Sequence, residues 1–182
     1  MSLDSLNINK DWTLFLDRDG VINQKRDNDY VKTIEEFIFL DGVIDAVKLF
    51  NSIFQRTVVV TNQQGIGKGI MTERNLEEIH GYMLDELKKE NAIIDAAYFA
   101  PQLKAENSIY RKPNVGMGAK AKRDYPTINF SKSVLIGDSE SDIEFGINLG
   151  MKTIFLQNGR NIDTKADFVF NELKDVAKEL KK

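Results

Sequence analysis

Residues 13–20 read TLFLDRDG, a short apolar run that ends in two aspartates and a glycine. Comparable runs rich in Val, Ile and Phe recur along the chain, and longer segments with helical spacing of apolar residues separate them. The runs place expected strands at residues 13–17, 57–61, 95–100, 133–137 and 153–156, with an additional one at 168–170. Strands that alternate with helices are typical of a parallel sheet with right-handed crossover connections. The predicted fold class is therefore α/β, with a central parallel sheet.

Three helices can be placed from their apolar spacing and their end signals. Two of them carry an apolar stripe, Val43, Val47, Phe50 and Phe54 in the first and Leu76, Ile79, Met83 and Leu87 in the second. Such stripes predict packing against the sheet. The third helix is expected over residues 139–149, with Ser139 as N-cap, Asp142 in a capping box and Gly150 as the stop signal.

Length and composition favour a single Rossmann-like three-layer domain over residues 1–182. The roughly forty residues between the first and second strands are mostly taken up by one core helix, which leaves no room for a separate cap domain. A formal net charge of −3 without an internal cluster of Lys and Arg argues against nucleic acid as a partner. The chain has no cysteine, no apolar leader and no run long enough to cross a membrane, so a cytoplasmic location is expected.

Polar residues stand where the predicted strands end. Asp17-Arg18-Asp19-Gly20 follows the first strand, Thr61-Asn62-Gln63 the second and Asp138-Ser139 the fourth, while Arg111-Lys112-Pro113 precedes another helix. In an open parallel sheet, ligands bind beyond the carboxyl ends of the strands. Several carboxylates at one edge repel each other unless a cation and an anionic ligand neutralise the charges. The pattern therefore favours a site for a metal ion and an anionic substrate.

Each of these residue types has a role in phosphoryl transfer. Asp17 is the candidate nucleophile for an aspartyl-phosphate intermediate, and Asp19 the candidate acid and base. Magnesium prefers oxygen ligands, which suits the Asp17 and Asp138 carboxylates together with the backbone carbonyl of Asp19. Lys112 and the Thr61 hydroxyl can contact the transferring phosphoryl oxygens.

Each position also has an ordinary structural interpretation. Asp19-Gly20 and Thr61-Asn62 taken alone are typical turns, and Asp142 fits a helix cap as well as a functional role. His80 lies on a charged helix and is expected to be structural. The combination of four such sites in order along the chain favours the functional interpretation.

Four segments resemble the motifs of the haloacid dehalogenase superfamily phosphatases. They are FLDRDGVIN at 15–23, VVVTNQQGIGKG at 58–69, RKPNVGM at 111–117 and GDSESD at 137–142. Within subfamily IIIA the chain is similar to the branch that contains the heptose bisphosphate and histidinol-phosphate phosphatases. Residues 29–46, DYVKTIEEFIFLDGVIDA, look more like the heptose enzymes.

The resemblance implies a role for each matching position. It makes Asp17 the nucleophile, Asp19 the acid-base residue and Asp138 a magnesium ligand. It implies phosphate ligands at Thr61 and Lys112, a supporting role for Asp142, and substrate contacts from Asn62, Gln63, Arg111 and the 63–69 loop.

The chain departs from its relatives in two places. Ser139 stands where many of them have a lysine. The four ligands of their zinc loop are replaced by Ala100, Gln102, Ser108 and Tyr110. We therefore expect magnesium but no zinc. We expect the 100–110 loop to be held by hydrogen bonds and by side-chain packing, with Leu103, Ile109 and Tyr110 pointing inward.

Three functions are compatible with these features. The leading one is hydrolysis of a phosphorylated sugar, with heptose bisphosphate ahead of histidinol phosphate, in an open site whose selectivity comes from the loops 23–33, 63–70 and 101–110. The others are a nucleic-acid-end phosphatase, which the acidic balance disfavours, and a signalling receiver domain with a phosphorylated aspartate. An acid-base residue next to the nucleophile favours turnover over a stable signal. The expected partner is a small phosphorylated molecule, and the protein is expected to be a monomer or a weak oligomer.

Overall fold

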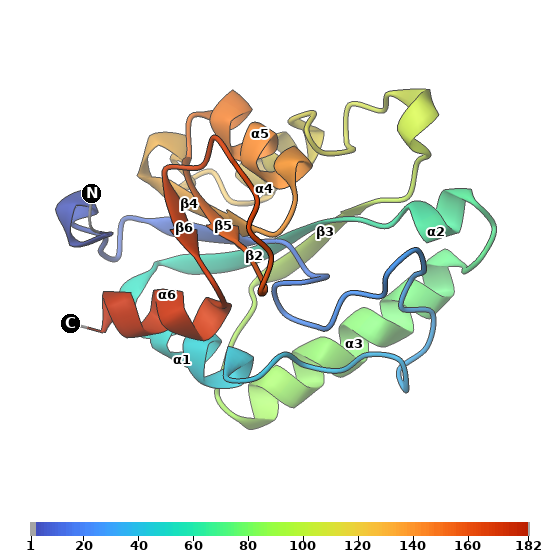
Figure 1. Cartoon of the computed structure of the whole chain (residues 1–182), viewed down its shortest axis with the longest axis horizontal. Coiled ribbons are helices and arrows are strands. Elements are labelled where there is room, and N and C mark those ends of the chain that lie inside the picture. Colours follow the sequence, from blue (N-terminus) through green and yellow to red (C-terminus); the bar gives the residue numbers. More distant parts are fainter. Residues whose placement is uncertain (1–2, 182) are drawn as a thin grey trace.

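A computed structural model describes residues 3–181, in which six parallel strands form one sheet (Figure 1). The strands are β1 (Thr13–Leu16), β2 (Arg56–Asn62), β3 (Ala96–Ala100), β4 (Ser133–Gly137), β5 (Lys152–Leu156) and β6 (Phe168–Phe170). Their order across the sheet is β3-β2-β1-β4-β5-β6. All six predicted strands are confirmed, and their ends differ from the predicted ones by no more than a residue.

Helices cover both faces of the sheet (Figure 1). On one face lie α1 (Val43–Ile53), α3 (Glu73–Lys89) and α6 (Leu173–Leu180), and on the other lie α4 (Gly116–Asp124) and α5 (Glu140–Leu149). The short helix α2 (Gln64–Gly67) follows β2 directly, and 3-10 turns occur at Leu3–Leu6, Lys104–Glu106 and Phe130–Lys132. The predicted three-layer α/β architecture is confirmed. None of the helices between residues 3 and 181 has the length and apolar character that crossing a membrane requires.

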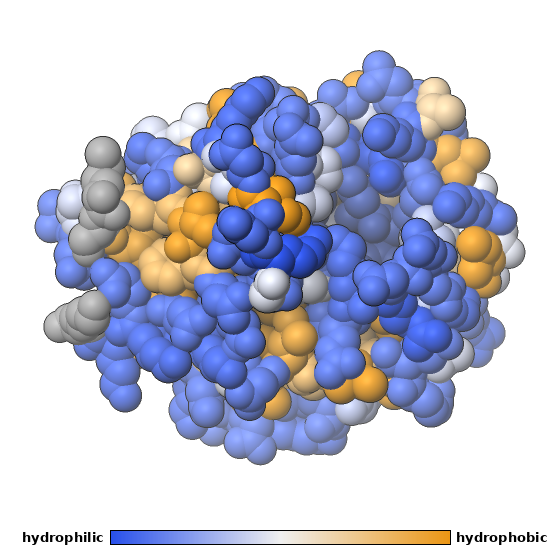
Figure 2. Space-filling view, in the orientation of Figure 1, coloured by the Kyte–Doolittle hydropathy of each residue, from blue (hydrophilic) through white to orange (hydrophobic). Residues whose placement is uncertain are grey.

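The alternation of side chains along each strand divides the core into two parts. Leu14 and Leu16 of β1 belong to the cluster that includes α1, α3 and α6, whereas Phe15 packs with Met117 and Phe145 of α4 and α5. The predicted stripe of α3 is fully buried, and each such side chain contributes ~1.5–3 kcal/mol by leaving water. Hydrophilic residues correspondingly cover most of the face seen in Figure 2, with apolar residues in a few separate areas.

The segment between β1 and β2 adds no second folding unit. Within residues 17–55 the structure describes a single helix, α1, preceded by a loop. Val21, Ile22, Val31 and Phe37 of that loop are buried in the same core as α1. The prediction that no separate cap domain stands here is confirmed for this part of the chain.

The sheet changes its winding direction between β1 and β4. Connections from β1 lead towards β3 on one side, and those from β4 lead towards β6 on the other. Leu16 pairs with Ile136 across this boundary, and the backbone N–H of Asp17 donates to the Ile136 carbonyl at 2.9 Å. Such a boundary opens a crevice beyond the strand ends, where ligands bind in open α/β sheets. Asp17 and Asp138 both lie at that crevice.

Candidate active site

A tight turn follows β1 and carries the first two aspartates. The Ile22 N–H donates to the Arg18 carbonyl at 2.8 Å, and the Gly20 N–H donates to the Asn23 carbonyl at 2.8 Å. Gly20 has a φ of 83°, and a Cβ atom there would collide with the Asp138 carboxylate. Glycine is therefore required both by the backbone conformation and by the close approach of the turn to Asp138.

The ammonium of Lys112 is the buried centre of the site. Its Nζ lies 2.9 Å from Asp17 Oδ1 and 2.6 Å from Asp142 Oδ1, and it donates to the Val60 carbonyl at 2.6 Å. Burial alone would lower the pKa of Lys112, but the Asp142 and Asp17 carboxylates outweigh it and raise the pKa. Lys112 is thus charged and fixed beside the candidate nucleophile.

Asp17 sits in an electrostatically unfavourable place for an anion. Burial and the Asp142 carboxylate raise the pKa of Asp17 to about 7, although Lys112 acts in the opposite direction. Burial also raises the pKa of Asp138, in spite of the nearby Lys25 ammonium. Further positive charge at this point would stabilise both carboxylates.

Three carboxylates could contribute to a metal site, because oxygens of Asp17, Asp138 and Asp142 lie within 4.8 Å of one another. Asp142, however, is engaged on both sides. Its Oδ1 faces Lys112, and its Oδ2 accepts from the Ser139 N–H at 3.0 Å and the Ser139 hydroxyl at 2.6 Å. The predicted capping box is confirmed. Asp17 and Asp138 lie at the crevice beyond the strand ends, and their hard carboxylate oxygens are of the kind that magnesium prefers.

Asp19 is held by three donors. Its Oδ1 accepts from Arg18 Nη2 at 3.0 Å and Asn23 Nδ2 at 3.0 Å, and its Oδ2 accepts from Gln63 Nε2 at 2.8 Å. Burial raises the pKa of Asp19, but the Arg18 charge and these hydrogen bonds together lower it. The carboxylate is therefore ionised and held in a fixed orientation two residues from Asp17.

Arg18 and His80 support Asp19 from inside the protein. Arg18 is fully buried, and its Nη1 lies 3.3 Å from His80 Nε2. Burial and the Arg18 charge lower the pKa of His80 to about 3, so the ring is neutral and its Nε2 accepts the hydrogen bond. The location agrees with the structural role expected for His80.

The side chains at the end of β2 hydrogen-bond to other residues of the site. Gln63 Nε2 donates to Thr61 Oγ1 at 2.9 Å as well as to Asp19, so the Thr61 hydroxyl proton stays available for a ligand. The Asn62 side chain exchanges two hydrogen bonds with the backbone of Lys112, at 3.0 and 3.1 Å. Both amides position other site residues, and the predicted contacts of Asn62 and Gln63 with substrate stay predictions.

Arg111 lies beside a separate hollow. Its Nη1 donates to the Gln102 carbonyl at 3.3 Å, and with Lys104 and Asn107 it lines a cavity of about 420 Å³ next to Lys112. The structure thus places the Arg111 guanidinium near the site, and its predicted contact with substrate stays a prediction.

The predicted packing of the 100–110 loop is wrong for two of its three residues. Ile109 and Tyr110 are 67% and 38% exposed, and only Leu103 is half-buried. The expected hydrogen bonds are present, because the Ile109 carbonyl accepts from the Gly116 N–H at 2.8 Å and the Lys104 N–H donates to Gln64 Oε1 at 2.7 Å. Tyr110 therefore does not position the following Arg111 through a buried side chain.

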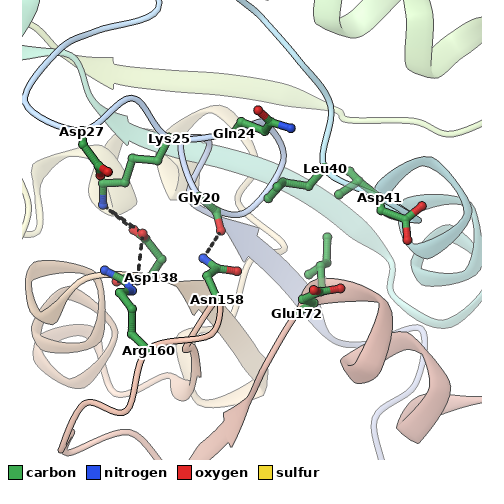
Figure 3. Close-up of a pocket in the computed structure, with 12 residues that line it drawn as sticks. Gly20, Gln24, Lys25, Asp27, Leu40, Asp41, Asp138, Asn158, Arg160 and Glu172 are labelled. Carbon is green, nitrogen blue, oxygen red and sulfur yellow. Dashed lines mark hydrogen bonds and ion pairs between the residues drawn. The ribbon is translucent and has the colours of Figure 1, made fainter.

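Two cations that sequence analysis missed converge on Asp138 (Figure 3). Lys25 Nζ lies 2.8 and 2.9 Å from the two carboxylate oxygens, and Arg160 Nη2 lies 3.2 Å from Oδ2. Neither residue belongs to a motif, and Lys25 is 113 positions from Asp138 along the chain. No spacing or periodicity in the sequence signals either contact.

The strand order, the paired aspartates after β1 and the buried lysine define a hydrolase of the haloacid dehalogenase type. A family model described as HAD-hydrolase-like matches residues 109–181. The D-glycero-alpha-D-manno-heptose-1,7-bisphosphate 7-phosphatase of Burkholderia mallei is 38% identical over 178 residues, covering 92% of both chains. The D-glycero-beta-D-manno-heptose-1,7-bisphosphate 7-phosphatase of Escherichia coli K12 is 36% identical over 93% of both chains. The chain belongs to this family of heptose-bisphosphate phosphatases within the haloacid dehalogenase superfamily.

Solved structures agree with this membership. The D,D-heptose 1,7-bisphosphate phosphatase from B. bronchiseptica, complexed with magnesium and phosphate, superimposes with a TM-score of 0.84 at 29% identity, covering 93% of this chain and 97% of that one. A putative HAD-like phosphatase from Mesorhizobium loti gives a TM-score of 0.74 at 26% identity, covering 93% of this chain and 85% of that one. The resemblance seen in the four motifs is therefore confirmed over most of the chain.

Proposed function

We propose that this phosphatase hydrolyses a sugar phosphate through an aspartyl-phosphate on Asp17, with D-glycero-D-manno-heptose 1,7-bisphosphate as its leading substrate. The observation that carries the mechanism is the Asp17 carboxylate 2.9 Å from the buried Lys112 ammonium, at the edge where the sheet changes direction. The names of the relatives support the substrate.

The side chains divide the reaction into two steps. In the first, a carboxylate oxygen of Asp17 attacks phosphorus, the bond from phosphorus to the sugar oxygen breaks, and Asp19 gives that oxygen a proton. The negative charge of the arriving phosphate favours a proton on Asp19, against the three donors that keep it ionised. In the second step Asp19 takes a proton from water, which attacks the phosphoryl group and frees Asp17. The Lys112 ammonium neutralises negative charge on the phosphoryl oxygens, and the Thr61 hydroxyl donates a hydrogen bond to them.

Magnesium fits the donor set at this site. The Asp17 and Asp138 carboxylates and the Asp19 carbonyl would hold it, and when bound it supplies positive charge to the transferring phosphoryl group. The magnesium complex of the B. bronchiseptica protein supports this choice.

We expect EDTA to abolish phosphate release and added magnesium to restore it. The physical reason is that the buried carboxylates and the phosphate need charge neutralisation at the same time. Phosphate release is measured before chelation, after it and after addition of excess Mg²⁺. Full activity after thorough chelation would exclude the magnesium-dependent mechanism.

Asp19→Asn is expected to slow turnover by roughly 10²–10⁴-fold while leaving magnesium affinity nearly unchanged. The amide cannot transfer the proton, whereas the backbone carbonyl that serves the metal is retained. Magnesium affinity is measured by titration calorimetry, with Asp138→Asn as the comparison variant. An equal loss of affinity in both variants would contradict the assignment of Asp19.

A substrate panel tests the proposed function directly. It contains the alpha and beta anomers of heptose 1,7-bisphosphate, histidinol phosphate and common hexose phosphates, and the readout is kcat/KM from steady phosphate release. The proposal requires the highest value for a heptose bisphosphate. A preference for histidinol phosphate would overturn the substrate, and a single phosphorylation without turnover would indicate a receiver-like role.

We also infer a one-domain, cytoplasmic protein that is monomeric or weakly associated and carries no structural zinc. A structural zinc site uses four Cys or His ligands, and the chain has no cysteine and a single histidine. Elemental analysis of the purified protein is expected to find no stoichiometric zinc. One zinc per chain would refute this.

A further inference from the structure

Asp138 is a buried carboxylate that is already neutralised by side chains of the protein. Its side chain is 1% exposed, and both of its oxygens accept from Lys25 Nζ, at 2.8 and 2.9 Å. Arg160 Nη2 lies 3.2 Å from Oδ2 and also donates to the Asp138 backbone carbonyl at 3.0 Å. Asp138 thus has two cationic partners. Lys25 contacts its carboxylate alone, and Arg160 contacts both its carboxylate and its backbone carbonyl (Figure 3).

Magnesium and Lys25 require the same atoms. A magnesium ion binds carboxylate oxygen at roughly 2.0–2.1 Å and dictates its geometry closely. An ammonium that contacts both oxygens of that carboxylate would sit within a few ångströms of the ion and repel it. Arg160 Nη2 keeps its contact with the Asp138 backbone carbonyl when the ion binds Oδ2, whereas the contacts of Lys25 Nζ with Asp138 are both to the carboxylate. Lys25 is therefore the cation that must leave when a divalent ion binds Asp138.

The surroundings of Lys25 allow such an exchange. Its side chain is 44% exposed, and it comes from the loop after β1 and not from a helix or strand. It lines a cavity of about 630 Å³ with Gly20 and Asn158, and a second one of about 520 Å³ with Ser139. An ammonium released from Asp138 has open space on either side and remains close to the crevice that holds Asp17.

We propose that Lys25 is an exchangeable counter-ion of Asp138, which a divalent cation displaces and which then serves as a ligand for an anionic group of the substrate. The inference rests on the proposed function, because it takes the displacing ion to be magnesium. It makes Lys25 a positioning residue for the metal and a binding residue for phosphate.

The two roles predict effects of opposite sign in Lys25→Gln. Loss of the competing ammonium should tighten magnesium binding about tenfold, the size expected when one charged hydrogen-bond partner no longer has to be displaced. With magnesium saturating, loss of the freed ammonium should weaken binding of inorganic phosphate, also by about tenfold. A merely structural role would weaken both.

Titration calorimetry of the full chain with MgCl₂, and then with inorganic phosphate at saturating Mg²⁺, measures both affinities. Lys165→Gln is the matched control, because Lys165 is exposed and lines the second cavity, whereas the cations that contact Asp138 there are Lys25 and Arg160. Arg160→Gln should change magnesium affinity less than Lys25→Gln. Thermal melting checks that each variant is folded.

Magnesium affinities of Lys25→Gln and Lys165→Gln that agree within twofold would overturn the exchange, and so would a loss of both affinities in Lys25→Gln. Unchanged phosphate affinity would overturn the substrate role of the ammonium. A wild-type protein that binds phosphate but no magnesium would instead overturn the metal of the proposed function, and this inference with it.

Discussion

Asp17→Asn is expected to lower turnover by roughly 10³-fold or more while the protein keeps its fold and its magnesium-dependent binding of phosphate. The amide has almost the same shape as the carboxylate but is a poor nucleophile. Steady phosphate release from a small monoester measures the loss, and calorimetry with inorganic phosphate measures the binding. Asp11→Asn is a suitable control, because Asp11 is an exposed partner of Lys132 and precedes β1, at the opposite end of that strand from Asp17. Residual hydrolysis within tenfold of wild type would contradict the covalent mechanism.

The same variant should also change how stability depends on pH. The folded protein keeps a proton on Asp17 up to a pKa of about 7, against 3.8 for an ordinary aspartate. The folded state therefore binds more protons than the unfolded state between these values, and the free energy of unfolding falls as pH rises through this range. Asn removes that contribution. Urea unfolding in EDTA at several pH values should show a smaller decline for Asp17→Asn than for wild type.

The fold could be predicted from the sequence because its signals are local. The spacing of apolar residues in runs such as Thr13–Leu16 and in the stripe of α3 is enough to indicate which side chains are buried. The parallel topology then brings the strand ends together, so Asp17 and Asp138 could be expected at one edge without any knowledge of their distance. Lys112 could be expected at the same edge as a positive charge for the phosphoryl oxygens, but its burial between the Asp17 and Asp142 carboxylates depends on the folded chain.

The features of the site that could not be predicted from the sequence depend on contacts between residues far apart in the chain and on side-chain directions. Lys25 and Arg160 are ordinary loop residues in the sequence, and only the folded chain brings their charges to Asp138. Gln63 was recognised as a polar strand-end residue, but its bridge between Asp19 and Thr61 is a matter of side-chain direction. The lack of a zinc site predicts burial of Tyr110, because the loop then needs apolar packing to be ordered, yet hydrogen bonds order it while Tyr110 stays exposed.

Lys112→Met is expected to remove activity and to lower the free energy of unfolding by about 3–5 kcal/mol, as is typical when one partner of a buried ion pair is lost. The Lys112 side chain is 1% exposed, and its ammonium is the positive charge between the Asp17 and Asp142 carboxylates. Without it, two buried carboxylates are left to repel each other, and the Val60 carbonyl loses its donor. Phosphate release and urea unfolding at neutral pH measure the two effects.

A double variant separates catalysis from stability. In Lys112→Met the Asp142 carboxylate is buried without its cationic partner. The double variant Lys112→Met/Asp142→Leu also removes that carboxylate, so it should recover at least half of the lost unfolding free energy. It should not recover turnover, because the ammonium that the proposed mechanism places against the phosphoryl oxygens is still missing. Asp142→Leu alone is the reference that completes the cycle. Turnover that returns together with stability would show that Lys112 acts only by holding the fold, and would remove it from the proposed mechanism.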